Sequence, residues 1–179
     1  MSENKLARQE KSDDRFQALL SNANASRAIS QAVEGTIGPK GLDIMMVDRF
    51  GDVVISNDGV TILKLMEVNH PAARMIINTA RAQQSEVGDG TTTATIIAAA
   101  LVAEGVEQVL KGVPVTRVIE GIEQGIAAAL NLVRKQSRAV ESLDDKVLFS
   151  IAEVAGRGKR DLARLVIKGA QLVGKKKLL

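Results

Sequence analysis

The chain has 179 residues, 45% of them hydrophobic, so it is long and apolar enough to bury a core. Aromatic residues make up only 2%, without Trp or Tyr, so the core must consist of Ala, Val, Ile and Leu, which favours packed helices. This scarcity argues against a nucleic-acid module that stacks bases, and a net charge of +3 is too small to indicate one. The absence of cysteine excludes disulfides and thiolate metal sites, and it fits a reducing compartment.

Neither a secretory leader nor a membrane span is expected from the hydrophobic pattern. Residues 1–15 are polar and charged, without the apolar stretch of a signal peptide. The most apolar run, 91–106, is short for a membrane span and is followed by charged residues. We therefore predict a cytoplasmic protein that binds neither nucleic acid nor membrane.

The first third of the chain predicts one helix and one hairpin. Residues 1–14 are polar and of mixed charge, and we expect a flexible arm there, or an edge strand supplied to a neighbouring chain. Apolar residues spaced three and four apart predict an amphipathic helix over 15–34. A loop with three glycines and a proline follows at 35–41, and two short apolar runs, 43–48 and 53–57, predict a β-hairpin.

The middle of the chain predicts three further helical segments. A tight turn at 57–59 precedes a short helix over 60–67, and a proline opens the next helix, over 71–86, because proline suits the first helical position. We assign His70, the single histidine, to a helix-start or surface role rather than to a metal site. The helix over 90–110 is apolar on most faces near its start and should be the buried core helix.

The last third predicts three helices. An amphipathic helix is expected over 116–138, after which the composition shifts. Residues 142–145 resemble an N-cap with acidic first-turn residues, and the helix that they open is interrupted by the basic glycine loop at 156–160. A final helix is expected over 161–173.

The most distinctive stretch is Gly88-Asp89-Gly90-Thr91-Thr92-Thr93, which directly precedes the apolar helix. Glycine allows close approach of a ligand, and a helix N-terminus favours anions, phosphate above all. Asp89 repels phosphate but can hold it through Mg²⁺, which takes carboxylate and phosphate oxygens together. The alternative is a plain turn followed by a threonine cap, and the stretch alone does not decide between the two.

Four loops combine glycine with a residue suited to phosphate or metal, namely 38–41, 57–59, 88–93 and 156–159. Each alone is more often a turn than a ligand site, and composition does not show whether they meet in space. No segment has the spacing of a Walker A loop or of a GxGxxG fingerprint, so nucleotide binding would need another fold. A single histidine in a turn also excludes a Ser-His-Asp triad.

Four stretches in their order and spacing resemble a chaperonin subunit: 35–41, 51–59, 70–73 and 86–93. The resemblance covers about 15–173. Asn57 before Asp58, together with His70-Pro71, resembles the thermosome (archaeal, group II-like) type, including its archaeal-like form in bacteria.

The resemblance implies a mainly α fold, a helical equatorial domain with a small β-hairpin plus the start of an intermediate domain. After the arm at 1–14, residues 15–139 would form the N-terminal half of the equatorial ATP-binding domain and 140–179 the beginning of the intermediate domain. The apical domain and the second equatorial half would be absent. The implied role is ATP-dependent protein folding, in which identical or homologous subunits form a double ring around unfolded client proteins.

The resemblance also implies the site residues, with ATP or ADP and Mg²⁺ as cofactors. Asp89 would bind Mg²⁺, and Asp58 would be catalytic by placing the attacking water. The nucleotide contacts would be Thr36, Gly38, Pro39, Gly90, Thr91, Thr92, Thr93, Gly158 and Lys159. Gly158 and Lys159 would sense the γ-phosphate, although the loop around them departs from the commoner Thr-Gly-Lys pattern.

A complete subunit of this family is much longer, and its other catalytic aspartate belongs to the second equatorial half. We therefore expect the 179 residues alone to be inactive, although the full chaperonin would hydrolyse ATP. The alternative is a non-catalytic structural or interaction fragment of such a subunit. A nucleic-acid binder that uses the lysines at 175–177 is disfavoured, because such a run is usually a solvated helix end.

Overall fold

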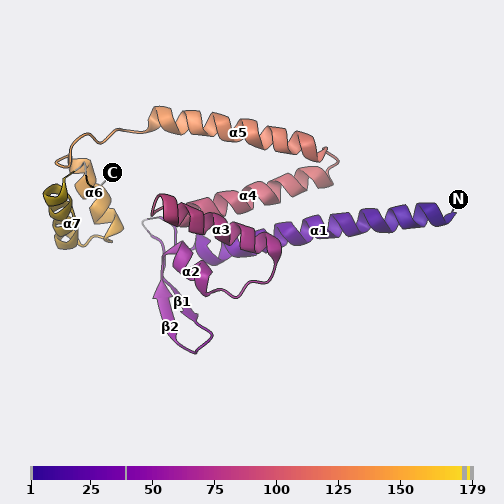
Figure 1. The fold of residues 1–179 in the computed structure, drawn as a ribbon, viewed down its shortest axis with the longest axis horizontal. Helices are drawn as coiled ribbons and strands as arrows, with labels where there is room; N and C mark the ends of the chain where they lie inside the picture. The colour runs from indigo at the N-terminus through magenta and orange to yellow at the C-terminus, as the bar shows by residue number, and fades with distance from the viewer. Residues whose placement is uncertain (1, 39, 175–176, 178–179) are drawn as a thin grey trace. The chain divides into compact units, whose positions relative to one another are not determined.

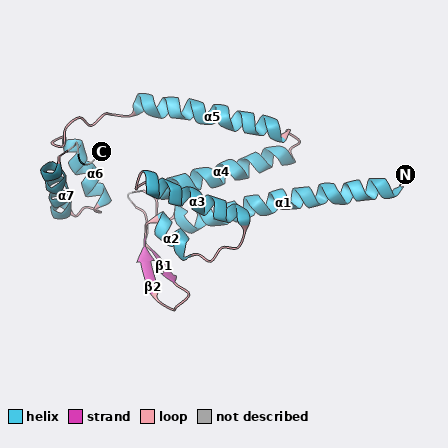
Figure 2. Ribbon diagram, viewed as in Figure 1, coloured by secondary structure: helices cyan, strands magenta, loops and turns pink. Residues whose placement is uncertain are grey.

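The computed structural model describes residues 2–38, 40–174 and 177, and leaves out the side chains of 2–13 and 15. The chain divides into two compact units, residues 1–126 and 127–179. The fold is mainly helical with one pair of strands, as expected (Figures 1 and 2). The elements are α1 (Ser2–Glu34), β1 (Ile44–Val47), β2 (Val53–Ser56), α2 (Gly59–Leu65), α3 (Pro71–Glu86), α4 (Thr91–Leu110), α5 (Val115–Gln136), α6 (Lys146–Ala155) and α7 (Arg160–Val173).

Helix α1 begins at Ser2, not at Arg15 as predicted. The structure therefore has helix where we expected an arm or an edge strand. The polar composition of 1–14 suggested irregular backbone, but composition of this kind reports exposure to water rather than backbone conformation. The segment contains neither Gly nor Pro, and Glu, Lys, Ala, Arg and Gln in it are strong helix formers.

The predicted hairpin is confirmed. Strands β1 and β2 pair antiparallel, with Met45 opposite Ile55 and Val47 opposite Val53. The carboxylate of Asp48 closes the connecting turn, because its Oδ1 accepts the N–H groups of Phe50 at 2.8 Å and Asp52 at 2.9 Å.

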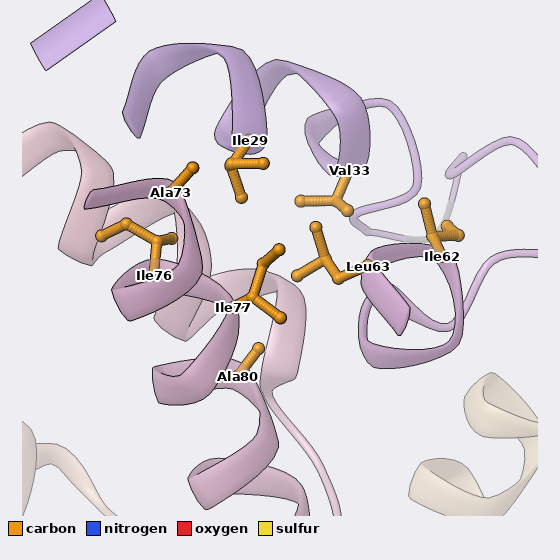
Figure 3. Packing of buried hydrophobic residues seen from close by; sticks show 8 residues of the cluster. All are labelled: Ile29, Val33, Ile62, Leu63, Ala73, Ile76, Ile77 and Ala80. Atoms are coloured by element: carbon orange, nitrogen blue, oxygen red, sulfur yellow. The ribbon is translucent and has the colours of Figure 1, made fainter. Parts of the chain in front are cut away.

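The core of the first unit is a cluster of small aliphatic side chains from three helices (Figure 3). Its members are Ile29 and Val33 of α1, Ile62 and Leu63 of α2, and Ala73, Ile76, Ile77 and Ala80 of α3. These residues are the Ala, Val, Ile and Leu that a chain almost without aromatic residues has available. Such short side chains let the helices approach closely.

Helix α4 packs against α1 and α3, and Figure 1 shows the three side by side. It buries Thr91, Thr95, Ala99, Ala103 and Val106 along one face. The rest of the helix is less covered than predicted, and Ile97 is 55% exposed. Of the helices in the described residues, α4 alone has the length and composition to cross a membrane, a property that core helices of soluble proteins share.

His70 begins α3, as predicted. Its Nδ1 accepts the N–H of Ala72 at 3.2 Å, and its Nε2 lies 3.1 Å from Ser21 Oγ of α1. Pro71 occupies the first helical turn, where its missing N–H has no helical partner to lose. The imidazole thus caps one helix and joins it to another.

Beyond α4, the predicted helices form but bury little within the described residues. None of the described side chains of α5 is buried, and the apolar stripe that predicts this helix stays accessible, with Ile119 and Leu130 each 50% exposed. In the second unit α6 packs against α7, where Ala163 is buried. Helix α6 starts later than the cap predicted at 142–145 implied: its N-cap is Asp145, whose Oδ1 accepts the N–H of Val147 at 2.9 Å, so the acidic residues precede the helix instead of forming its first turn.

Replacing Leu63 by alanine should destabilise the first unit strongly. Leu63 is 1% exposed in the cluster, and such truncations cost about 2–5 kcal/mol because a cavity remains. Met75→Ala is the matched control, because Met75 lies on α3 but is 71% exposed and should change stability by less than about 0.5 kcal/mol. Denaturant unfolding of both variants checks this; equal midpoints would contradict the assigned core.

Candidate functional site

The N-terminus of α4 is an uncapped helix end. Its N-cap residue is Gly90, which takes φ 78° and offers no side chain to cap the first turn. The N–H of Ala94 donates to Gly90 O at 2.9 Å and so begins the helical ladder. The N–H groups of Thr91, Thr92 and Thr93 therefore have no acceptor within the helix. Together with the helix dipole they favour an anion at this end.

The loop after α1 reaches this helix end. Thr36 is buried, and its Oγ1 donates to Val33 O at 2.7 Å and lies 3.5 Å from Thr92 Oγ1. Thr91 is also buried, and its carbonyl accepts the hydroxyl of Thr95 at 2.8 Å. The Thr36–Thr92 contact joins the loop after α1 to the first turn of α4.

The Asn-Asp-Gly turn before α2 lies at the same place. A Cβ on Gly59 would lie 2.4 Å from Thr92 Oγ1 and 3.1 Å from Thr92 N, so only glycine fits there without a shift. Next to it, Asp58 caps α2, because its Oδ2 accepts the Thr61 N–H at 3.2 Å and the Thr61 hydroxyl at 2.6 Å. Two of the four glycine loops singled out from the sequence, 57–59 and 88–93, therefore meet at the start of α4, and the loop after α1 reaches the same place through Thr36.

Asp89 presents an exposed carboxylate beside this helix end. Its Oδ1 accepts the N–H of Gly90 at 2.7 Å. The described residues contain no group of three or more His, Cys, Asp or Glu that could hold a metal by themselves. A cation here would thus take Asp89 together with oxygens of an anionic ligand and water, which is the coordination that Mg²⁺ prefers. The donor set fits Mg²⁺ bound with a phosphate.

The structure does not show contacts between the start of α4 and the other predicted nucleotide-binding residues that it describes. Gly38 is in the loop after α1, with φ 84°, and its carbonyl accepts the Gly41 N–H at 2.9 Å. Pro39 lies outside the described residues. Gly158 and Lys159 belong to the second unit, where Lys159 precedes α7 as its N-cap.

One residue of this site was missed from the sequence. Gln83, in the last turns of α3, donates from Nε2 to the carbonyl of Asp89 at 2.8 Å. A glutamine near a helix end is common and predicts no particular function. The only signal in the sequence was its separation of six residues from Asp89.

The chain is similar in sequence to a known family of proteins. Residues 29–178 match the model of the TCP-1/cpn60 chaperonin family. Thermosome subunit alpha of Archaeoglobus fulgidus is 41% identical over 161 residues, which are 87% of this chain and 30% of that protein. The thermosome subunit of Methanothermococcus thermolithotrophicus is 40% identical over 158 residues, which are 85% of this chain and 29% of that protein.

A solved structure shows the same fold. The crystal structure of a group III chaperonin in the open state matches this chain with a TM-score of 0.79 and 54% sequence identity. The matched region covers 90% of this chain and 33% of the chaperonin chain in that structure. The chain thus spans about a third of the length of these relatives. The family match over most of the sequence and the shared fold lead to one conclusion: the chain belongs to the TCP-1/cpn60 chaperonin family and is of the thermosome type.

Proposed function

We propose that the native protein containing this chain binds Mg²⁺-ATP where the loops after α1, before α2 and before α4 meet. The observation that carries this proposal is the convergence of Thr36 after α1, Gly59 at the start of α2 and Thr92 at the start of α4, around a helix start without a side-chain cap. In a ring of identical or homologous subunits, hydrolysis would drive the conformational change that folds client proteins in the cytoplasm. Family membership supports this role.

The phosphates would be held by backbone groups rather than by a positively charged side chain of the first unit. The free N–H groups of Thr91, Thr92 and Thr93 point their positive ends out of the helix start, and Thr93 is exposed to solvent. Gly38 and Pro39 would border the nucleotide through their backbone. Such a fixed array needs no rearrangement when negative charge develops, which is the basis of electrostatic catalysis.

Asp89 would hold Mg²⁺, which when bound neutralises phosphate charge during phosphoryl transfer. The Asp89 Oδ1 that accepts the Gly90 N–H still has a free lone pair, and Oδ2 is a second ligand atom. A role of Gly158 and Lys159 in sensing the γ-phosphate stays a prediction from the family resemblance.

Asp58 would orient the water that attacks the γ-phosphate. Its Oδ2 is engaged in capping α2, so Oδ1 is the atom available for water. Capping also holds the carboxylate in one orientation, a condition for positioning a nucleophile.

Asp58→Asn and Asp58→Ala should separate the two roles of this carboxylate. Asparagine caps helices as well as aspartate does, so Asp58→Asn should keep stability yet slow ATP hydrolysis about 100-fold or more. Asp58→Ala should slow hydrolysis similarly and also cost about 0.5–2 kcal/mol of stability. Single-turnover hydrolysis and denaturant unfolding of the native protein measure both; unchanged hydrolysis by Asp58→Asn would exclude the catalytic role.

The binding proposal is tested by titrating the native protein with a fluorescent ADP analogue, with Mg²⁺ and with excess chelator. Saturable binding that weakens on chelation is expected. Absence of binding would instead favour a non-catalytic structural module, an alternative for which the exposed apolar stripe of α5 is the supporting observation.

A further inference from the structure

We propose that Gln83 is a positioning residue that sets the direction of the Asp89 carboxylate and thereby the affinity for Mg²⁺. This inference rests on the proposed Mg²⁺-nucleotide site. It concerns a residue on the preceding helix that touches neither metal nor phosphate and acts through the backbone of Asp89.

Gln83 holds the loop between α3 and α4 with both its backbone and its side chain. Its carbonyl accepts the N–H groups of Val87 at 3.0 Å and Gly88 at 3.3 Å, which end α3. Its Nε2 reaches forward to the Asp89 carbonyl at 2.8 Å. One residue of a packed helix therefore ties both the beginning and the end of the loop.

The loop needs such a tie because its own backbone is permissive. Gly88 and Gly90 take φ values of 81° and 78°, on either side of Asp89. Glycine populates positive and negative φ about equally, so neither residue resists rotation of the peptide groups around Asp89. The side-chain bond from Gln83 to the Asp89 carbonyl fixes one of these peptide groups.

Fixing that peptide also fixes the carboxylate. The Asp89 carbonyl belongs to the peptide group whose N–H, on Gly90, donates to Asp89 Oδ1 at 2.7 Å. Rotation of this peptide would move the donor away from the carboxylate and turn the cap residue of α4 at the same time. Gln83 thus supports the proposed metal ligand and the phosphate-binding helix start through one bond. Outer-shell contacts of this kind typically change metal affinity about 10–100-fold.

Gln83→Met is the test variant, because methionine is of similar length, favours helix and has no donor. Gln84→Met is the matched control, because Gln84 is the exposed neighbour on the same helix. In Gln83→Met, hydrogen exchange of the native protein without nucleotide should speed up about fivefold at the hydrogen-bonded amides of Gly90 and Ala94, as expected for loss of one hydrogen bond. The exchange rates of the α1 amides should not change in Gln83→Met, and those of the loop should not change in Gln84→Met.

The second readout is a ratio of two affinities for ADP, the affinity measured in the presence of Mg²⁺ divided by the affinity measured in the presence of excess chelator. Gln83→Met should lower this ratio about tenfold or more while the metal-free affinity stays close to that of the unmodified protein. A merely structural loss would lower both affinities together. Unchanged exchange at Gly90 and Ala94, or an unchanged ratio, would overturn the inference. Failure of the unmodified protein to bind nucleotide would refute the proposed site, and the exchange rates would still decide whether Gln83 holds the loop.

Discussion

Asp89→Ala is expected to weaken binding of Mg²⁺-ATP by the native protein more than about 100-fold. Removing even an outer-shell partner of a metal costs about 10–100-fold, and Asp89 would be the direct ligand. No cluster of other acidic or imidazole groups among the described residues could take its place. Isothermal titration with Mg²⁺-ATP, and with ATP in chelator, measures the loss.

Asp89→Asn separates charge from structure in the same experiment. Its amide oxygen can still accept the Gly90 N–H, so the loop should keep its hydrogen bond while the site loses its negative charge. Asp52→Ala is the control for a lost surface carboxylate, because Asp52 is exposed in the hairpin turn. Nearly native metal-dependent affinity in Asp89→Asn would exclude a carboxylate ligand at this position.

Gly59→Ala is expected both to destabilise the protein and to weaken nucleotide binding. The added methyl group would lie 2.4 Å from Thr92 Oγ1 and 3.1 Å from the backbone N of Thr92. Rotating the threonine relieves the first contact but not the second, so the starts of α2 and α4 must shift apart by a few tenths of an ångström. Overpacking of this kind costs about 1–3 kcal/mol. The movement separates Asp58 from the phosphate-binding turn, so hydrolysis should fall as well.

Gly121→Ala is the control for Gly59→Ala, with an effect of opposite sign. Gly121 lies inside α5, and a Cβ there would meet nothing within 4 Å. Replacing glycine by alanine in a helix interior stabilises by about 0.5–1 kcal/mol. Denaturant midpoints should therefore shift downward for Gly59→Ala and upward for Gly121→Ala. A neutral Gly59→Ala would contradict the close contact between the two helix starts.

Local sequence signals were sufficient for most of the fold. The Pro71 start of α3 and the hairpin depend on residues near in sequence, and the structure confirms them. The predicted start of α1 was wrong, because a charged segment without Gly or Pro can be helical without burying apolar side chains. The apolar stripe of α5 predicts the helix correctly, but periodicity does not say what covers it.

The sequence indicated which residues belong to the candidate site, but it did not indicate how they lie relative to one another. Glycine, aspartate and threonine patterns pointed to Asp58, Asp89 and the threonines after Gly90, and the structure shows that their loops meet. The proximity of Gly59 to Thr92 is a tertiary contact between residues 33 positions apart, which no local pattern encodes. Gln83 was missed for the same reason, since its role depends on a loop folding back onto α3.

The central claim is that three loops of the first unit form one Mg²⁺-nucleotide site. Hydrogen exchange of the native protein with and without Mg²⁺-ADP tests it most directly. We expect protection at 35–41, 57–61 and 88–95 together, lost on chelation of Mg²⁺, while the β1–β2 hairpin is unaffected. Protection of only one of these segments, or of none, would contradict a shared site.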